Sequence, residues 1–146
     1  MCMCCRVQDV RPSAAGGPIT ILDLCSGVGY LSLLLSELLE SSGPDVVARF
    51  VLVDEAWPRG DNTGPLRPGH INKDHLTLEG VWSHEILCRK CDFKSSYGHR
   101  ELAKYVLARA PGPVAVLGVH LCGLLSLKAV QFYNDHPRCS FFALKV

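Results

Sequence analysis

The chain has 146 residues, a net charge of +1, 48 % hydrophobic residues and 20 % charged residues. This length allows one domain with its own core, and this composition excludes a disordered chain. The near-zero charge gives no overall attraction to nucleic acid, no apolar run is long enough to span a bilayer, and the N-terminus lacks the apolar segment of a signal peptide.

The first third of the chain predicts a strand, a tight turn, a helix and a second strand. Residues 1–18 indicate a flexible leader. Residues 19–24 form a short apolar run rich in β-branched side chains, which is typical of a buried parallel strand. After a Gly-x-Gly turn, leucines at helical spacing predict a helix over residues 30–39 that ends at a Ser-Ser-Gly-Pro sequence. Residues 46–53 form the second apolar strand.

The rest of the chain predicts a long loop followed by three strands and two helices. Residues 56–73 contain prolines and glycines among scattered charges, and long loops in compact domains are often functional. Apolar runs and helical spacing predict the remaining elements: strands over residues 82–88, 114–120 and 139–144, and helices over residues 97–110 and 124–134.

The alternation of strands and helices predicts the fold class. It indicates an α/β domain over residues 19–146, with a doubly wound, mostly parallel sheet and helices on both faces. In such sheets ligands bind at the carboxyl ends of the strands, near the point where the strand order reverses. Because the chain ends directly after the fifth strand, we expect the domain to be C-terminally incomplete.

Eight cysteines raise the question of disulfides or a metal. The chain can build its own core and shows no export signal, so we expect reduced thiols and an intracellular protein, in the cytoplasm or alternatively the nucleus. The C-x-x-C formed by Cys88 and Cys91 has no second pair at zinc-finger spacing. We therefore expect no metal site there, with one of the two thiols packed inward.

The residues with the clearest chemical signals fall at the ends of predicted strands. Gly27 and Gly29 can adopt positive φ and let a ligand approach the backbone, and the helix after them offers free N–H groups. Asp54 ends the second strand, where a carboxylate can bind both hydroxyls of a ribose. Asp92 and Phe93 follow the third strand and suit the amine and the ring of an adenine. The alternatives are glycines that only shape a turn and carboxylates that are solvated.

These segments resemble the motifs of class I S-adenosylmethionine-dependent methyltransferases. DLCSGVG at residues 23–29 looks like their first motif, RFVLVD at residues 49–54 like the second, and CDF at residues 91–93 like the third. GVHLCG at residues 118–123 is the most specific piece and resembles the methyltransferase domain 32 group, which includes relatives of tRNA 2′-O-methyltransferases. The resemblance covers about residues 20–145.

The resemblance implies a Rossmann-like fold, S-adenosylmethionine as the methyl donor, and RNA as the acceptor, with the ribose of tRNA as the leading example. His120 would face the sulfonium and act as the general base for a hydroxyl acceptor; alternatively it hydrogen-bonds the turn and shapes the pocket. Asp23 would lie near the methionine end of the cofactor. The cofactor-binding residues would be Asp23, Cys25, Gly27, Gly29, Asp54, Asp92 and Phe93.

Three functions stay open. The first is a methyltransferase acting on RNA, for which a basic rim would attract phosphates, although a solvated loop is the alternative. The second is a catalytically inactive methyltransferase-like module, favoured by Cys25, which stands where many related turns carry glycine. The third is a nicotinamide-dependent oxidoreductase, against which Ser32 argues, since it replaces the third glycine of that fingerprint. The rim would comprise Arg59, Arg67, His70, Lys73, His75, Arg89, Lys90 and Lys94.

Overall fold

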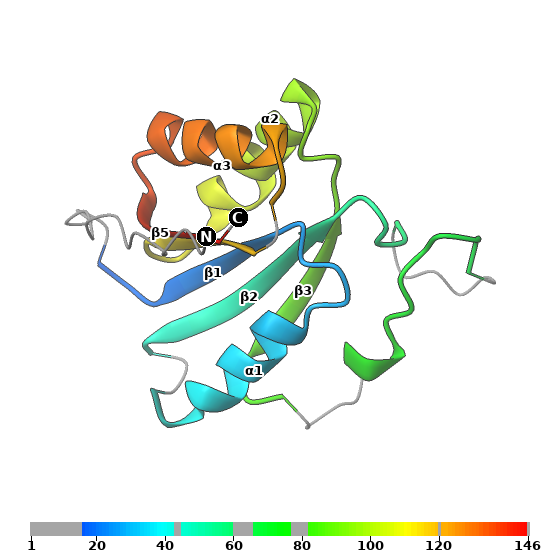
Figure 1. The fold of residues 1–146 in the computed structure, drawn as a ribbon. Helices are drawn as coiled ribbons and strands as arrows, with labels where there is room; N and C mark the ends of the chain where they lie inside the picture. The colour runs from blue at the N-terminus through cyan, green and yellow to red at the C-terminus, as the bar shows by residue number, and fades with distance from the viewer. Residues whose placement is uncertain (1–15, 43–44, 60–65, 77–81, 120, 146) are drawn as a thin grey trace, which may run out of the picture.

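The fold is given by a computed structural model that describes residues 16–42, 45–59, 66–76, 82–119 and 121–145 (Figure 1). In these ranges strands and helices alternate along the chain. The strands are β1 (Ile19–Leu24), β2 (Val47–Asp54), β3 (Glu85–Lys90), β4 (Val114–Val119) and β5 (Cys139–Lys145). The α-helices are α1 (Tyr30–Leu38), α2 (Ser96–Tyr105) and α3 (Leu124–Asp135). Each helix in the described ranges is too short or too polar to span a membrane.

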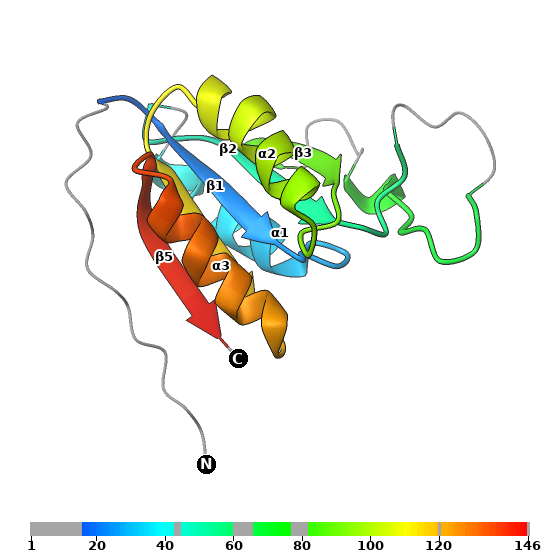
Figure 2. The ribbon, with the colours of Figure 1, turned by 90° about the horizontal axis from the view of Figure 1, so that it is seen from above.

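The five strands form one parallel sheet in the order β3-β2-β1-β4-β5. The order runs outward from β1 to β3 and then from β4 to β5, so it reverses between β1 and β4. Helix α1 lies on one face of the sheet, and α2 and α3 lie on the other (Figures 1 and 2). This arrangement confirms the predicted Rossmann-like, doubly wound α/β fold. It also places the carboxyl ends of β1 and β4 at the reversal point, where such sheets bind ligands, with the end of β2 next to that of β1.

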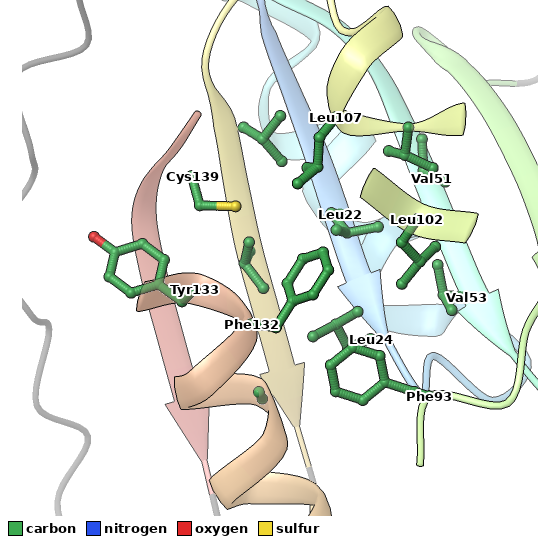
Figure 3. Packing of buried hydrophobic residues seen from close by; sticks show 14 of the residues in the cluster. Leu22, Leu24, Val51, Val53, Phe93, Leu102, Leu107, Phe132, Tyr133 and Cys139 are labelled. Atoms are coloured by element: carbon green, nitrogen blue, oxygen red, sulfur yellow. The ribbon is translucent and has the colours of Figure 1, made fainter. Parts of the chain in front are cut away.

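The larger apolar core lies between the sheet and helices α2 and α3. Leu22 and Leu24 of β1, Leu102 of α2 and Phe132 of α3 are fully buried in it (Figure 3). Each side chain of this size stabilises the fold by about 1.5–3 kcal/mol when it leaves water. The apolar faces predicted from helical spacing therefore account for how α2 and α3 sit on the sheet.

Described residues between β2 and β3 pack on the other face of the sheet, beside α1. Trp57 is fully buried in the smaller core cluster, together with Phe50 of β2. Ile71 and Leu76 are partly buried and pack against the same cluster. The predicted long loop therefore contributes apolar side chains to the core, because burying them is favourable.

Strand β3 begins at Glu85, three residues later than the sequence indicates. The chain bends at residues 82–84 instead of pairing with β2. The His84 side chain is buried, and its Nδ1 lies 3.3 Å from the hydroxyl oxygen of Ser36 in α1. His84 thus contacts α1 at a position where the sequence predicts pairing with β2.

Helix α2 ends at Tyr105, earlier than the predicted residue 110, and a short 3₁₀ turn (Leu107–Arg109) follows it. The Arg138 guanidinium, just before β5, donates to the carbonyl oxygens of Leu107 at 2.7 Å and of Ala110 at 3.1 Å. These two hydrogen bonds join the segment after α2 to the residue that precedes β5.

Candidate functional site

The turn between β1 and α1 contains two glycines with different roles. Gly27 and Gly29 have φ of 54° and 86°, a region that glycine adopts without steric cost. A Cβ at Gly29 would overlap the side chain of Leu52 in β2, so Gly29 is required for close packing of α1 on the sheet. A Cβ at Gly27 would meet no atom within 4 Å, so Gly27 leaves the backbone open to a ligand.

Cys25 also has a positive φ, of 55°. This conformation costs a side-chain-bearing residue about 1–2 kcal/mol, which explains why glycine suits the position better. Burial, and after it the negative charges of Asp54 and Glu55, raises the pKa of the thiol to about 11. The thiol is therefore protonated at neutral pH and forms a wall of the site, not a nucleophile.

Asp23 is a buried carboxyl at the end of β1. It is 2 % exposed, and its Oδ2 accepts a hydrogen bond of 2.8 Å from the hydroxyl of Ser32 in α1. Burial raises the pKa of Asp23 to about 6; the bond from Ser32 lowers it, and the charge of Asp54 raises it further. Ser32 thus occupies the position of the third glycine in a dinucleotide-binding fingerprint, and its hydroxyl donates a hydrogen bond to the Asp23 carboxyl.

Asp54 joins the end of β2 to the glycine turn. Its Oδ2 accepts the backbone N–H of Gly27 at 3.0 Å, and its Oδ1 accepts the backbone N–H of Ala56 at 2.9 Å. The amide of Gly27 is therefore already satisfied by a carboxylate. Each carboxylate oxygen still has a second lone pair that can accept a bond from a hydroxyl group.

A hollow of about 140 Å³ lies at the carboxyl ends of the strands, beside the start of α3. It is smaller than the roughly 300–1,000 Å³ of pockets that enclose a drug-sized ligand, so it can hold one end of such a ligand. Four of the seven predicted cofactor-binding residues line this hollow. Its walls include Cys25, Asp54, Asp92, Phe93, Lys94 and Leu125.

Asp92 and Phe93 contribute to the hollow in different ways. Asp92 is exposed, and its Oδ1 accepts the backbone N–H of Lys94 at 2.9 Å. Phe93 is 2 % exposed, and its ring stacks on His99 with the ring centres 4.6 Å apart. One face of the Phe93 ring is thus occupied within the core, and its predicted stacking on an adenine stays a prediction.

The segment after β2 holds the glycine turn at two points that the sequence did not indicate. The indole N–H of Trp57 donates to the hydroxyl oxygen of Ser26 at 3.3 Å. The Nε2 of His75 lies 2.7 Å from the carbonyl oxygen of Val28, a distance at which its N–H donates to that oxygen. A tryptophan within a stretch of prolines, glycines and charges was the available signal, because so large an apolar ring is seldom left in water.

His120, the predicted catalytic base, lies outside the described residues, and its role stays a prediction. Its neighbours fix the ends of the flanking elements. Val119 ends β4, Leu121 is fully buried, and Gly123 precedes α3 with a φ of 57°. The HLCG sequence therefore connects β4 to α3 at the edge of the sheet where β1 also ends.

The Cys88 and Cys91 side chains pack against different core clusters. Cys88 belongs to the cluster on the α1 face and Cys91 to the cluster under α2 and α3. Burial raises the pKa of both thiols to about 11, whereas zinc binds thiolates. Across the described ranges, no three His, Cys, Asp or Glu side chains are grouped so as to hold a metal ion.

The chain was also compared with known proteins. Protein-family models, curated protein sequences and solved structures gave no match to the chain. The functional assignment therefore depends on the chemistry of the residues around the turn.

Proposed function

We propose that the chain binds S-adenosylmethionine at the β1–α1 turn and transfers its methyl group, with RNA as the substrate class and the ribose of tRNA as the leading acceptor. The observation that carries the choice of cofactor is the hydrogen bond from the Gly27 amide to Asp54. In dinucleotide sites the backbone N–H groups at such a turn donate hydrogen bonds to the pyrophosphate. Here the Asp54 carboxylate already accepts the hydrogen bond of one such N–H group, and its negative charge would repel a phosphate placed beside it.

The charges around the turn support a cationic nucleoside over an anionic one. Asp23, Asp54, Glu55 and Asp92 lie at the ends of the strands. Two neighbouring cations are Lys94, 4.0 Å from the Glu55 carboxylate, and Lys90, whose ammonium donates to the Glu55 carbonyl oxygen at 2.7 Å. S-adenosylmethionine carries a sulfonium and an ammonium group, and negative side chains attract both. A nicotinamide dinucleotide would bring two phosphates to the same surface, so an oxidoreductase fits less well.

The described residues fit this cofactor. Asp54 would accept hydrogen bonds from the ribose hydroxyls, Asp92 would accept one from the adenine amine, and Gly27 would allow the ligand to touch the backbone. When bound, the cofactor supplies an activated methyl group, so the protein mainly aligns the acceptor for in-line attack. His120 would take the proton of a hydroxyl acceptor.

A catalytically inactive module is the second candidate, and one observation favours it. Cys25 occupies a left-handed conformation that suits glycine, and its side chain narrows a hollow that is already small. Such a module would bind S-adenosylmethionine or a protein partner without turnover. Binding without methyl transfer to any RNA would select this candidate.

Calorimetric titration of S-adenosylmethionine into the wild type and two aspartate variants tests the cofactor. Asp54→Ala removes two charge-assisted hydrogen bonds and should weaken binding about 100-fold. Asp54→Asn keeps one acceptor oxygen for the backbone and guards against a loss that arises only from a distorted turn. Asp45→Ala is the matched control, because Asp45 is exposed just before the opposite end of β2. Equal affinity for the wild type and both Asp54 variants would contradict the placement of the site.

Turnover requires a separate measurement, in which transfer of a tritiated methyl group to total RNA is followed. His120→Ala should leave cofactor affinity unchanged and lower the transfer rate about 10²- to 10⁴-fold, the usual contribution of a general base. A transfer rate equal to that of the wild type would rule out His120 as the base.

A further inference from the structure

Seven cationic side chains gather along strand β3 and the elements beside it. The whole chain has a net charge of only +1, so this gathering is a local feature. Glu85, which is 3.9 Å from Arg49, and Glu101 are acidic side chains on the same surface. We call this surface the basic edge, and its members are Arg49, Arg59, Lys73, Arg89, Lys90, Lys104 and Arg109.

The basic edge contains a hollow of about 550 Å³, larger than the acidic one at the strand ends. Among the described residues, strand β3 forms one edge of the sheet and has no further strand beside it (Figure 2). The hollow lies between the segment after β2, which contributes Arg59 and Lys73, strand β3 with Arg89 and Lys90, and helix α2. A smaller hollow of about 140 Å³ is also lined by Arg89 and extends the surface to Arg49 and Arg109.

Aromatic rings accompany these cations. The Arg89, Lys104 and Arg109 cations lie 5.6, 4.9 and 5.1 Å from the ring centre of Tyr105. A ring in this position orients the cations and leaves their charge intact. Tyr97 of α2 lines the large hollow and is 60 % exposed, so its ring is open to a partner.

We propose that the basic edge binds the phosphate backbone of a single-stranded RNA segment, with one base stacked on Tyr97. The cations supply the attraction to phosphate, and an exposed aromatic ring can stack an unpaired base but not a base inside a duplex. The choice of RNA rests on the proposed function, whose substrate this surface would hold. Cys91 lines both the large hollow and the candidate cofactor hollow, so the bound strand would pass beside the cofactor.

Fluorescence anisotropy with a labelled RNA of about 12 nucleotides tests this surface in the absence of cofactor. Affinity is measured between about 50 and 200 mM salt, where log K falls with log salt by about 0.7 for each phosphate contacted on a single strand. Arg59→Ala with Arg89→Ala should reduce the slope by about 1.4. The matched control is Lys128→Ala with Lys145→Ala, which removes the same charge from α3 and β5 and should leave the slope unchanged.

Stacking is tested by Tyr97→Ala, which should weaken binding about tenfold without changing the salt slope, and by Tyr97→Phe, which should restore the affinity. Circular dichroism of each variant confirms that the fold is retained. The proposal is overturned if both double variants have the same slope, if duplex RNA binds as tightly as the single strand, or if polyglutamate displaces the RNA at equal charge.

Failure of this proposal and failure of the proposed function are distinguishable. RNA binding that depends on the basic edge, with no binding of S-adenosylmethionine, would support this surface and contradict the methyltransferase. If the chain binds S-adenosylmethionine but both double variants bind RNA with equal affinity, the cofactor proposal would be supported and the role of the basic edge would be contradicted.

Discussion

Replacing Asp23 with asparagine should remove a pH dependence of stability that the buried carboxyl causes. The pKa of Asp23 is raised from 3.8 to about 6 in the folded state, mainly by burial. Between these two pH values the folded chain binds more protons than the unfolded chain. The free energy of unfolding therefore falls as the pH rises from about 3.8 through about 6, and it stays lower at neutral pH.

The magnitude follows from the same two values. Raising a carboxyl pKa from 3.8 to about 6 corresponds to about 3 kcal/mol of stability lost once the group is ionised in both states. Asparagine has nearly the same shape, can still accept the bond from Ser32, and does not ionise. Its amide N–H₂ needs a partner, and an unsatisfied buried donor costs about 1–3 kcal/mol at every pH. The pH dependence, and not the absolute stability, is therefore the informative quantity.

Urea unfolding of the wild type and Asp23→Asn between about pH 3.5 and 7.5 measures this difference. The wild type should lose about 3 kcal/mol more than the variant across that range. Ser32→Ala, which removes the hydroxyl that lowers the carboxyl pKa, should move the upper end of the transition to a higher pH. Parallel profiles for the wild type and Asp23→Asn would refute the assignment of a buried, ionising carboxyl.

Three further substitutions test the turn and the segment that holds it. Gly29→Ala should destabilise the fold by about 3 kcal/mol in urea unfolding, because its Cβ would overlap Leu52 at a positive φ; a loss below about 1 kcal/mol would contradict this packing. Trp57→Phe should lower the free energy of unfolding by about 2 kcal/mol, because it leaves a cavity and removes the hydrogen bond to Ser26. An unchanged melting temperature would show that the indole is not buried. Cys25→Gly should change the free energy of unfolding by less than about 1 kcal/mol and should bind S-adenosylmethionine at least as tightly as the wild type. Weaker binding would contradict the inference that the Cys25 side chain narrows the hollow.

The elements of the fold could be predicted because their signals are local. Apolar runs bounded by glycine and proline gave β1 with both its ends correct, and the leucines after the turn gave α1 to within one residue. The wrong start of β3 has a distant cause. His84 contacts Ser36 of α1, 48 residues away in the chain, and no local pattern encodes that contact.

The candidate site was predictable only in part, for the same reason. A parallel topology brings the strand ends together, which is why Asp54 and Asp92 line one hollow as expected. The contacts of Trp57 with Ser26 and of His75 with Val28 join residues 31 and 47 positions apart, so spacing gave no hint of them. Four members of the basic edge belong to the rim predicted from the sequence: Arg59, Lys73, Arg89 and Lys90. The other three, Arg49, Lys104 and Arg109, come from β2, α2 and the turn after α2, and no run in the sequence connects them.

The central claim is that the β1–α1 turn selects a cationic nucleoside over an anionic dinucleotide. Calorimetric titration of the wild type with S-adenosylmethionine and, separately, with a nicotinamide dinucleotide tests it most directly. The bond between Asp54 and the Gly27 amide predicts saturable binding of S-adenosylmethionine and none of the dinucleotide under the same conditions. Equal or tighter binding of the dinucleotide would contradict the account.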